Sequence, residues 1–350
     1  MRILLETHHP AHIHFFKYPV QHWVGKGYDI RVIGRDRDVM RSLSECYSWM
    51  PTVIPPAPTG GKKKTLAFGQ FASRQLRVAR EILRFKPDLL LSLMGSYTQS
   101  SFILNVPQWI FTDSEFQHFN HRIAHPFTKR IYTPECFYKP LGPKQIRYPS
   151  YHELAFLHPD RFKPRKEVLT KLGLTEGERY AIIRLSAWDT YHDIKHGGIR
   201  HTLNDILDQV KPRARCFIVP EGGRLPEALE PLRFPCPPDW FHDALAFAHF
   251  VITEGASTAS EAACLGTPAI YINDTEARGY LEDQQKRYQL VYGFPEPQQA
   301  IDQIDPLLER LERDPESIRN AHKQLIDDHV DLSQYVIDQV AQFADEQQLA

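Results

Sequence analysis

The stretch from Phe250 to Asn273, FVITEGASTASEAACLGTPAIYIN, restricts the possible folds more than any other part of the chain. Its apolar, β-branched run Phe250–Thr253 predicts a buried strand, and the small residues that follow predict a tight turn. Ala259–Leu265 predicts a compact helix, which a Gly-Thr-Pro sequence ends before the next buried strand, Ala269–Ile272. A strand, a crossover helix and a further strand at this spacing are typical of a parallel sheet with helices on its faces.

The turn between this strand and this helix has the composition of an anion site. Gly255, Ala256, Ser257 and Thr258 carry little side-chain bulk, so backbone N–H groups at the start of the helix can approach an anion closely. Glu261 follows one turn into the helix, near the same end. Phosphate on the N–H groups and a sugar hydroxyl on the carboxylate would together hold a nucleotide-diphosphate sugar.

An ordinary strand–helix corner explains the same residues without a ligand. In this alternative Ser257 caps the helix, and Ser260 or Glu261 completes a capping box. The local pattern leaves both interpretations open.

The length and composition predict the number of domains and argue against nucleic-acid-binding, secreted and membrane-spanning proteins. The chain has 350 residues, 42% hydrophobic and 24% charged, with a formal net charge of −1, which predicts about two globular domains at ~100–200 residues each. The absence of a net basic field argues against a general nucleic-acid binder. We find no secretory signal pattern and no apolar run long enough for a transmembrane helix, so we expect a cytoplasmic protein.

Strand and helix patterns alternate in both halves of the chain. The predicted strands are Arg2–Glu6, Tyr28–Gly34, Pro51–Pro55, Leu89–Met94, Val106–Phe111, Arg130–Thr133, Ile146–Ser150, Tyr180–Leu185, Ala214–Pro220, Phe250–Thr253 and Ala269–Ile272. The other predicted helices include Phe15–Gly25, Asp38–Tyr47, Leu66–Phe85, Ile301–Arg313, Glu316–Asp327 and Leu332–Phe343. The charged, proline-containing segment Glu153–Lys166 is typical of a linker.

These patterns predict an α/β protein with two Rossmann-like, doubly wound domains that face a central cleft. We assign residues 1–160 to an N-terminal domain, 161–330 to a C-terminal domain, and 331–350 to a C-terminal helix that packs near the interdomain region. In such sheets ligands bind outside the carboxyl ends of the strands, so the loops after strands carry the candidate site residues.

The turn and helix from Gly255 to Glu261 resemble the glycine-rich signature in the C-terminal domain of GT-B fold glycosyltransferases. They are similar to that segment of the cell-wall enzyme that adds N-acetylglucosamine to the lipid-linked muramyl precursor, and of the non-hydrolysing UDP-N-acetylglucosamine 2-epimerases. In those families the turn cradles the diphosphate and the helix Glu contacts the ribose. The resemblance therefore implies a GT-B fold, an N-terminal domain that binds the acceptor, and a donor site in the C-terminal domain.

Further blocks carry a narrower resemblance. They are Pro10–Phe16 (PAHIHFF), Phe111–Glu115 (FTDSE), Ile183–Asp189 (IRLSAWD) followed by His192-Asp193, and Glu254–Pro268. In this order, along nearly the whole chain, they resemble the glycosyltransferase-like family called domain of unknown function 354.

Three residues of the N-terminal half are candidates for acid–base chemistry. His14 precedes the predicted helix, and Asp113 and Glu115 follow an apolar strand, where a carboxylate can deprotonate an acceptor hydroxyl. The four histidines between His8 and His14 also suggest a metal site, although a structural role in which His12 and His14 hydrogen-bond the helix start is an alternative. Helix capping is the alternative for Asp113 or the serine beside it.

Arg184, Ser186 and Glu221 are candidate donor contacts in the second half. Arg184 lies at the end of a predicted strand, and a guanidinium fork suits phosphate oxygens. An ion pair with Asp189 or Asp193 is the structural alternative for this arginine.

Two short charged motifs have simpler explanations than a site. Asp36-Arg37-Asp38 matches the DxD pattern of the other main glycosyltransferase fold, yet acidic residues also suit the start of a helix. Lys62-Lys63-Lys64 is a basic loop that is either solvated or in contact with an anionic acceptor or a membrane surface. The five cysteines form no CxxC pair. We therefore expect neither a metal nor a cofactor.

Together these features predict a glycosyltransferase that takes a nucleotide-sugar donor, UDP-linked by resemblance, and an acceptor that the sequence does not identify. A UDP-N-acetylglucosamine 2-epimerase is the alternative enzyme. Epimerases usually carry an Asp where this chain has Ser96 and a second Glu where it has Ala262, and both departures weaken that alternative. A nucleotide-sugar binding protein without catalysis is the third possibility.

Overall fold

The computed structural model describes residues 1–34, 64–96, 98–175, 177–185, 198–220, 225–274 and 278–348. The chain divides into two compact units, the first formed by Met1–Phe156 with Val330–Ala350 and the second by Leu157–His329. The predicted helix Asp38–Tyr47 and strand Pro51–Pro55 lie outside the described residues.

The division falls inside the segment expected to be a linker. Its residues Leu154–Leu157 form a short helix, α6, and all four are buried. Four consecutive apolar side chains are excluded from water at this point, so the start of the predicted linker is a buried helix.

The first unit contains a sheet in which all strands are parallel. Its order is β2-β1-β3-β4-β5-β6. The strands are β1 (Arg2–Thr7), β2 (Asp29–Gly34), β3 (Leu89–Ser92), β4 (Gln108–Phe111), β5 (Arg130–Pro134) and β6 (Gln145–Tyr148). β3 and β4 are buried along their whole length, as expected of strands covered on both faces.

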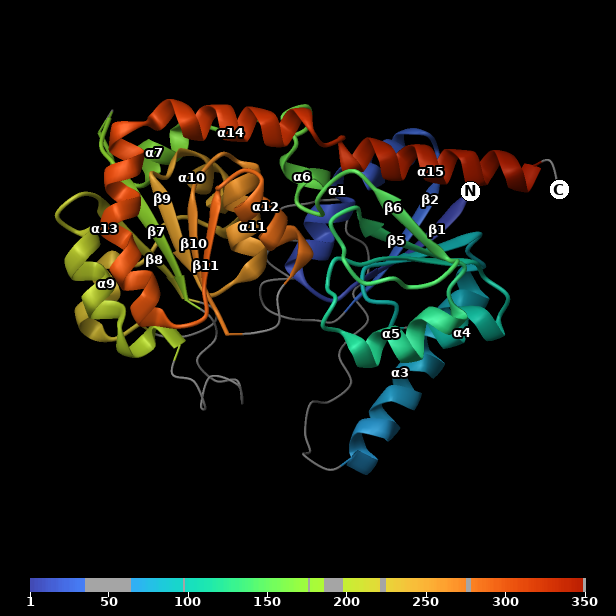
Figure 1. Ribbon diagram of the computed structural model, residues 1–350. Helices are drawn as coiled ribbons and strands as arrows, with labels where there is room; N and C mark the ends of the chain where they lie inside the picture. Colours follow the sequence, from blue (N-terminus) through green and yellow to red (C-terminus); the bar gives the residue numbers. More distant parts are fainter. Residues whose placement is uncertain are drawn as a thin grey trace. The chain divides into compact units, whose positions relative to one another are not determined.

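Helices cover both faces of this sheet (Figure 1). On one face α3 (Lys64–Phe85) packs Val78 and Ile82 against Leu4 and Leu90 of the strands. On the other, α1 (Pro10–Gly25) and α15 (Leu332–Gln348) contact each other and cover the aromatic residues of β4. Two shorter helices, α4 (Thr98–Ile103) and α5 (His118–Ala124), complete the unit together with the 3-10 helix η1 (His125–Phe127).

Helix α1 begins earlier than the predicted Phe15. Pro10 occupies the first turn, where its missing N–H costs nothing, and the His9 side chain accepts a hydrogen bond from the Ala11 N–H. The run His12–His14 is therefore helical rather than part of a loop.

The second unit repeats the arrangement. Its parallel sheet has the order β11-β10-β9-β7-β8. The strands are β7 (Tyr180–Leu185), β8 (Arg215–Pro220), β9 (Phe250–Thr253), β10 (Ala269–Ile272) and β11 (Val291–Phe294). Strand β11 was missed from the sequence, because it contains Gly293 and only its first residue, Val291, is fully buried.

Numbered by chain order within each unit, the first five strands of both sheets have the arrangement 2-1-3-4-5. In sheets of this order ligands bind at the switch point between the first and third strands, which here are β1 and β3, or β7 and β9.

Helices of the second unit also lie on both sides of its sheet (Figure 1). They are α7 (Glu167–Lys171), α9 (Leu203–Val210), α10 (Phe241–Phe247), α11 (Ala256–Cys264), α12 (Gly279–Lys286), α13 (Pro297–Arg313) and α14 (Pro315–Asp327), with the 3-10 helices η2 (Gly198–His201), η3 (Glu227–Leu232) and η4 (Pro238–Trp240). None of the described helices combines the length and the apolar character needed to cross a membrane.

Candidate functional site

The corner between β9 and α11 is the first part of the candidate site. Gly255 is the N-cap of α11, and no side chain caps this described helix. The capping-box alternative is therefore wrong, and the helix begins at Ala256, three residues before the predicted start. Ser257 is exposed while Ala256 and Thr258 are buried. Among the described residues, therefore, no side chain caps the first N–H groups of α11, and N–H groups of this kind can bind an external anion.

Arg184 lies beside this corner because β7 and β9 are neighbours. The residue pairs in register with Thr253, the last residue of β9, and its carbonyl accepts the Glu254 N–H. Its guanidinium lies over the Phe241 ring at 5.4 Å. A Cβ atom added at Gly255 would lie 3.9 Å from the Arg184 Nε. The structure therefore brings together Arg184 and the turn at Gly255, as the sequence predicted.

Two carboxylates of the corner have partners inside the second unit. Glu261 lies 3.3 Å from the Nε2 of His242, and both side chains are almost fully buried. The Glu254 carboxylate accepts the Ile199 N–H at 2.8 Å, which ties the end of β9 to η2. His242 was not recognised in the sequence, because nothing in the local pattern of α10 indicates a partner on α11.

The equivalent corner of the first unit is organised by a buried carboxylate. Glu6, in β1, accepts hydrogen bonds from the Ser92 hydroxyl at 2.7 Å and the Ser96 N–H at 3.1 Å, and lies 2.7 Å from the Nε2 of His8. Burial alone opposes its charge, but these partners outweigh it and lower the pKa of Glu6. The sequence analysis missed Glu6, although an acidic residue inside the apolar strand RILLET is a visible signal.

Asp113 forms the clearest acid–base pair of the first unit. Its carboxylate lies 3.2 Å from the Nδ1 of His152, a buried residue that the sequence analysis also missed. Burial opposes the charged imidazole, yet Asp113 is close enough to raise the pKa of His152. Gln117, not Asp113, is the N-cap of α5, so helix capping by Asp113 or Ser114 is wrong.

His12 belongs to the same neighbourhood. Its Nδ1 accepts the His8 N–H, and burial together with His8, His9 and His152 lowers the pKa of His12 well below its ordinary value. His12 is therefore a neutral hydrogen-bond acceptor at neutral pH, which agrees with the structural alternative for this residue.

The other two acid–base candidates lie in less accessible positions. His14 is buried and stacks on the Phe156 ring at 5.2 Å. Glu115 is 1% exposed, so a substrate reaches its carboxylate only if the surrounding chain opens. Asp113, with a side chain 19% exposed, is the accessible candidate of the three.

Several predicted residues lie outside the described part of the chain. They are Ser186 and Glu221, the acids Asp189 and Asp193, the DxD sequence at 36–38, and Lys62-Lys63; of Lys64 only the backbone, in α3, is described. Among the described residues no group of three or more His, Cys, Asp or Glu side chains is placed to hold a metal ion.

Known proteins resemble this chain mainly in fold. MnaA from S. aureus, solved with UDP, has a TM-score of 0.66 at 12% identity, covering 98% of this chain and 97% of that one. UDP-GlcNAc 2-epimerase from Neisseria meningitidis, bound to UDP-GlcNAc, has a TM-score of 0.66 at 13% identity, covering 97% of this chain and 99% of that one. MurG from Acinetobacter baumannii has a TM-score of 0.62 at 12% identity, covering 98% of this chain and 100% of that one. These similarities show a GT-B fold.

A search of curated proteins finds no match. The model of the family described as "Protein of unknown function (DUF354)" matches residues 1–290. The chain belongs to this family.

Proposed function

We propose that this DUF354 protein is a glycosyltransferase of GT-B type, which binds a nucleotide-diphosphate sugar through its second unit and transfers the sugar to an acceptor. One observation carries the proposal. At the switch point of the second unit, Arg184 lies beside the uncapped start of α11, so that a guanidinium and backbone N–H groups converge on one place. Both groups favour a diphosphate over a neutral ligand.

The first unit supports this interpretation by contrast. There the chain's own Glu6 carboxylate accepts the Ser96 N–H in the loop before α4. In the second unit the residue at the same strand position is a cation. A turn flanked by a cation is suited to an anion that arrives with a ligand.

The known neighbours agree in the kind of ligand. MnaA was solved with UDP, and the N. meningitidis epimerase with UDP-GlcNAc. We therefore take UDP-linked sugars as the first donors to test.

Transfer requires a base and stabilisation of the leaving group. The acceptor oxygen bonds to the anomeric carbon, the bond from that carbon to the diphosphate breaks, and the acceptor loses its proton. Asp113, oriented by His152, is the proposed base, and Arg184 with the α11 N–H groups offsets the charge that develops on the diphosphate. These groups supply positive charge without a metal ion, so we expect donor binding to persist in a chelator.

A thermal-shift titration of the full chain tests the donor site. UDP and UDP-GlcNAc are expected to raise the melting temperature, since a ligand that binds the native state stabilises it, whereas uridine has little effect because it lacks the diphosphate. Asp113→Asn serves as the control, with an unchanged UDP shift. No shift with any nucleotide-sugar at millimolar concentration would contradict the proposal.

A 2-epimerase is the second candidate, because UDP-GlcNAc 2-epimerases are among the structural neighbours. Ser96 contributes its N–H to Glu6, and Ala262 is fully buried within α11, so neither position offers the carboxylate expected of an epimerase. Incubation with UDP-GlcNAc alone, followed by NMR of the C2 proton, separates the two. Exchange of that proton without an acceptor would favour the epimerase.

A further inference from the structure

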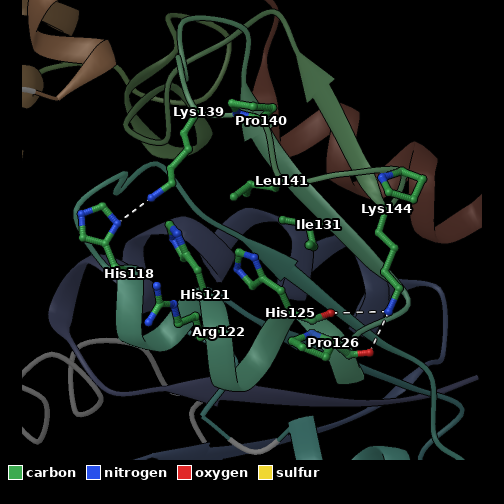
Figure 2. Close-up of a pocket in the computed structure, with 11 residues that line it drawn as sticks. His118, His121, Arg122, His125, Pro126, Ile131, Lys139, Pro140, Leu141 and Lys144 are labelled. Atoms are coloured by element: carbon green, nitrogen blue, oxygen red, sulfur yellow. Dashed lines mark hydrogen bonds between the residues drawn. The ribbon is translucent and has the colours of Figure 1, made fainter.

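A cavity of about 550 Å³ lies in the first unit, between α5 and the loop that joins β5 to β6 (Figure 2). His118, His121 and His125 line it from α5 and η1, and Lys139 and Lys144 line it from the loop. Cavities of this size hold small organic ligands.

The polar side chains that line this pocket are all basic residues: histidine, arginine or lysine. Arg122 joins the three histidines and two lysines, and no acidic side chain is among the described residues of the lining. The Lys144 ammonium donates to the carbonyls of His125 and Pro126, and Lys139 contacts the Nδ1 of His118. The lysines are thus positioned by the pocket itself, while their charge is not neutralised by a carboxylate of the lining.

His125 is the most informative member of the lining. It is 8% exposed, and among the described residues its Nε2 has no hydrogen-bond partner. Its ring stacks on that of His121 at 4.5 Å. Burial, reinforced by the neighbouring bases, lowers the pKa of both histidines to about 4. A buried polar atom without a partner is costly in a folded protein, so this atom indicates a missing acceptor or donor.

Apolar groups lie next to these bases. Ile131 and Leu141 line the pocket together with three prolines. Phe119 and Tyr138, adjacent in sequence to His118 and Lys139, are more than half exposed. The combination suits an anionic group attached to an apolar one.

We propose that this pocket binds a phosphate group carried on an apolar substituent. The phosphate oxygens take the hydrogen bonds of Arg122, Lys139 and His125, and the substituent lies on Ile131, Leu141 and the prolines. The site lies wholly within the first unit, so it stands or fails independently of the nucleotide-sugar site of the second.

Calorimetric titration of the full chain with inorganic phosphate and with phenyl phosphate tests the site directly. Phenyl phosphate is expected to bind at least tenfold more tightly than inorganic phosphate. Sedimentation with vesicles of phosphatidic acid or of phosphatidylcholine tests a lipid source for the same group. Binding to phosphatidic acid but not to phosphatidylcholine assigns the site to a lipid headgroup, and binding of phenyl phosphate without either vesicle assigns it to a free phosphate ester.

Variants separate this pocket from general attraction to a basic surface. The double substitution Arg122→Ala and Lys139→Ala is expected to weaken binding of phenyl phosphate at least tenfold. Lys26→Ala, an exposed charge outside the pocket, is the matched control and leaves it unchanged. A spectroscopic readout adds to this: phenyl phosphate raises the pKa of His125, followed through its ring-proton resonance and assigned with His125→Gln.

Three results would overturn the proposal. They are no binding of phenyl phosphate or phosphatidic acid by the wild-type chain, an equal loss in the Lys26→Ala control, and a His125 resonance whose titration the ligand leaves unmoved.

Discussion

The switch points of the two units share strand order and register but carry side chains of opposite charge at the same strand position. Glu6 is the fifth residue of β1 and pairs with Ser92, the last residue of β3; Arg184 is the fifth residue of β7 and pairs with Thr253, the last of β9. In each corner the hydroxyl of that last residue accepts a backbone N–H of the following turn. Topology alone therefore does not determine which corner binds a ligand.

What differs is the source of the negative charge at each turn. In the first unit Glu6 provides it internally, with Ser96 and His8 as partners. In the second unit the same strand position carries Arg184, and the carboxylates near the turn, Glu254 and Glu261, are held by the Ile199 N–H and by His242. The side chain at the fifth strand position thus differs in charge between the two corners, and this difference is the basis of the donor site proposed for the second unit.

The glycines of the two corners offer the largest test of this contrast. Gly95 has φ +67, and a Cβ there would lie 2.5 Å from the Ile110 Cδ1 and 3.2 Å from the Ala124 Cβ. Gly255 has φ −90 and only ordinary contacts around an added Cβ. Gly95→Ala is therefore expected to lower the free energy of unfolding by about 3 kcal/mol, through strain and overpacking.

Gly255→Ala is the matched substitution in the second unit. It is expected to cost less than about 1 kcal/mol of stability while weakening UDP binding several-fold, because the methyl group lies next to Arg184. Chemical denaturation and UDP titration measure the two effects. Equal destabilisation by both substitutions would remove the contrast between the corners.

Reversing the charge at Arg184 is the second test. Arg184→Glu copies the arrangement of the first unit, with an internal carboxylate near the start of α11. Binding of UDP is expected to weaken about 100-fold, or about 2.7 kcal/mol, without loss of folding stability. Arg184→Gln, which removes the cation but adds no anion, is expected to lose about tenfold. If both variants bind UDP as the wild type does, Arg184 does not contact the diphosphate.

Removing the charge at Glu6 is the third test. Glu6→Gln is expected to cost the first unit about 2 kcal/mol at pH 7, because it weakens hydrogen bonds to a buried carboxylate, and to leave UDP affinity unchanged. Hydrogen exchange of the β1 and β3 amides measures the loss within this unit.

The pH dependence of that loss checks its cause. The folded-state pKa of Glu6 is lowered, so its charge stabilises the unit above the ordinary carboxyl pKa of 4.5, and this contribution is lost as pH falls through the lowered value. The difference between wild type and Glu6→Gln should therefore shrink below pH 4.5. A difference independent of pH would assign the effect to packing rather than to charge.

The sequence predicted the corner of the second unit because its signals are local. A β-branched run, small turn residues and a Gly-Thr-Pro break all act within a few positions, and β9 and β10 have the predicted bounds. The start of α11 was placed too late because the small residues Gly255–Thr258 were all assigned to the turn, whereas the helix already begins at Ala256.

The partners of the site residues could not be predicted in the same way. Glu6 and Ser92 are 86 positions apart, and their contact exists only because β1 and β3 are paired in the sheet. The pairs of Asp113 with His152 and of Glu261 with His242 likewise depend on packing between separate elements. A single sequence carries no local pattern for such contacts. The sequence therefore indicated Asp113 and Glu261 but not their partners, His152 and His242.

The return of α15 to the first unit has a consequence for the covalent layout. Because Val330–Ala350 belongs with Met1–Phe156, the second unit is an insertion whose two ends are both joined to its host. The two joining segments meet within the first unit. There the Val330 N–H donates to the Pro149 carbonyl, and the Ser150 hydroxyl donates to the Val330 carbonyl. Cleavage of the chain at one junction therefore leaves the second unit attached through the other junction. Removal of α15, by contrast, uncovers the Trp109 ring of the first unit, which packs on Phe343.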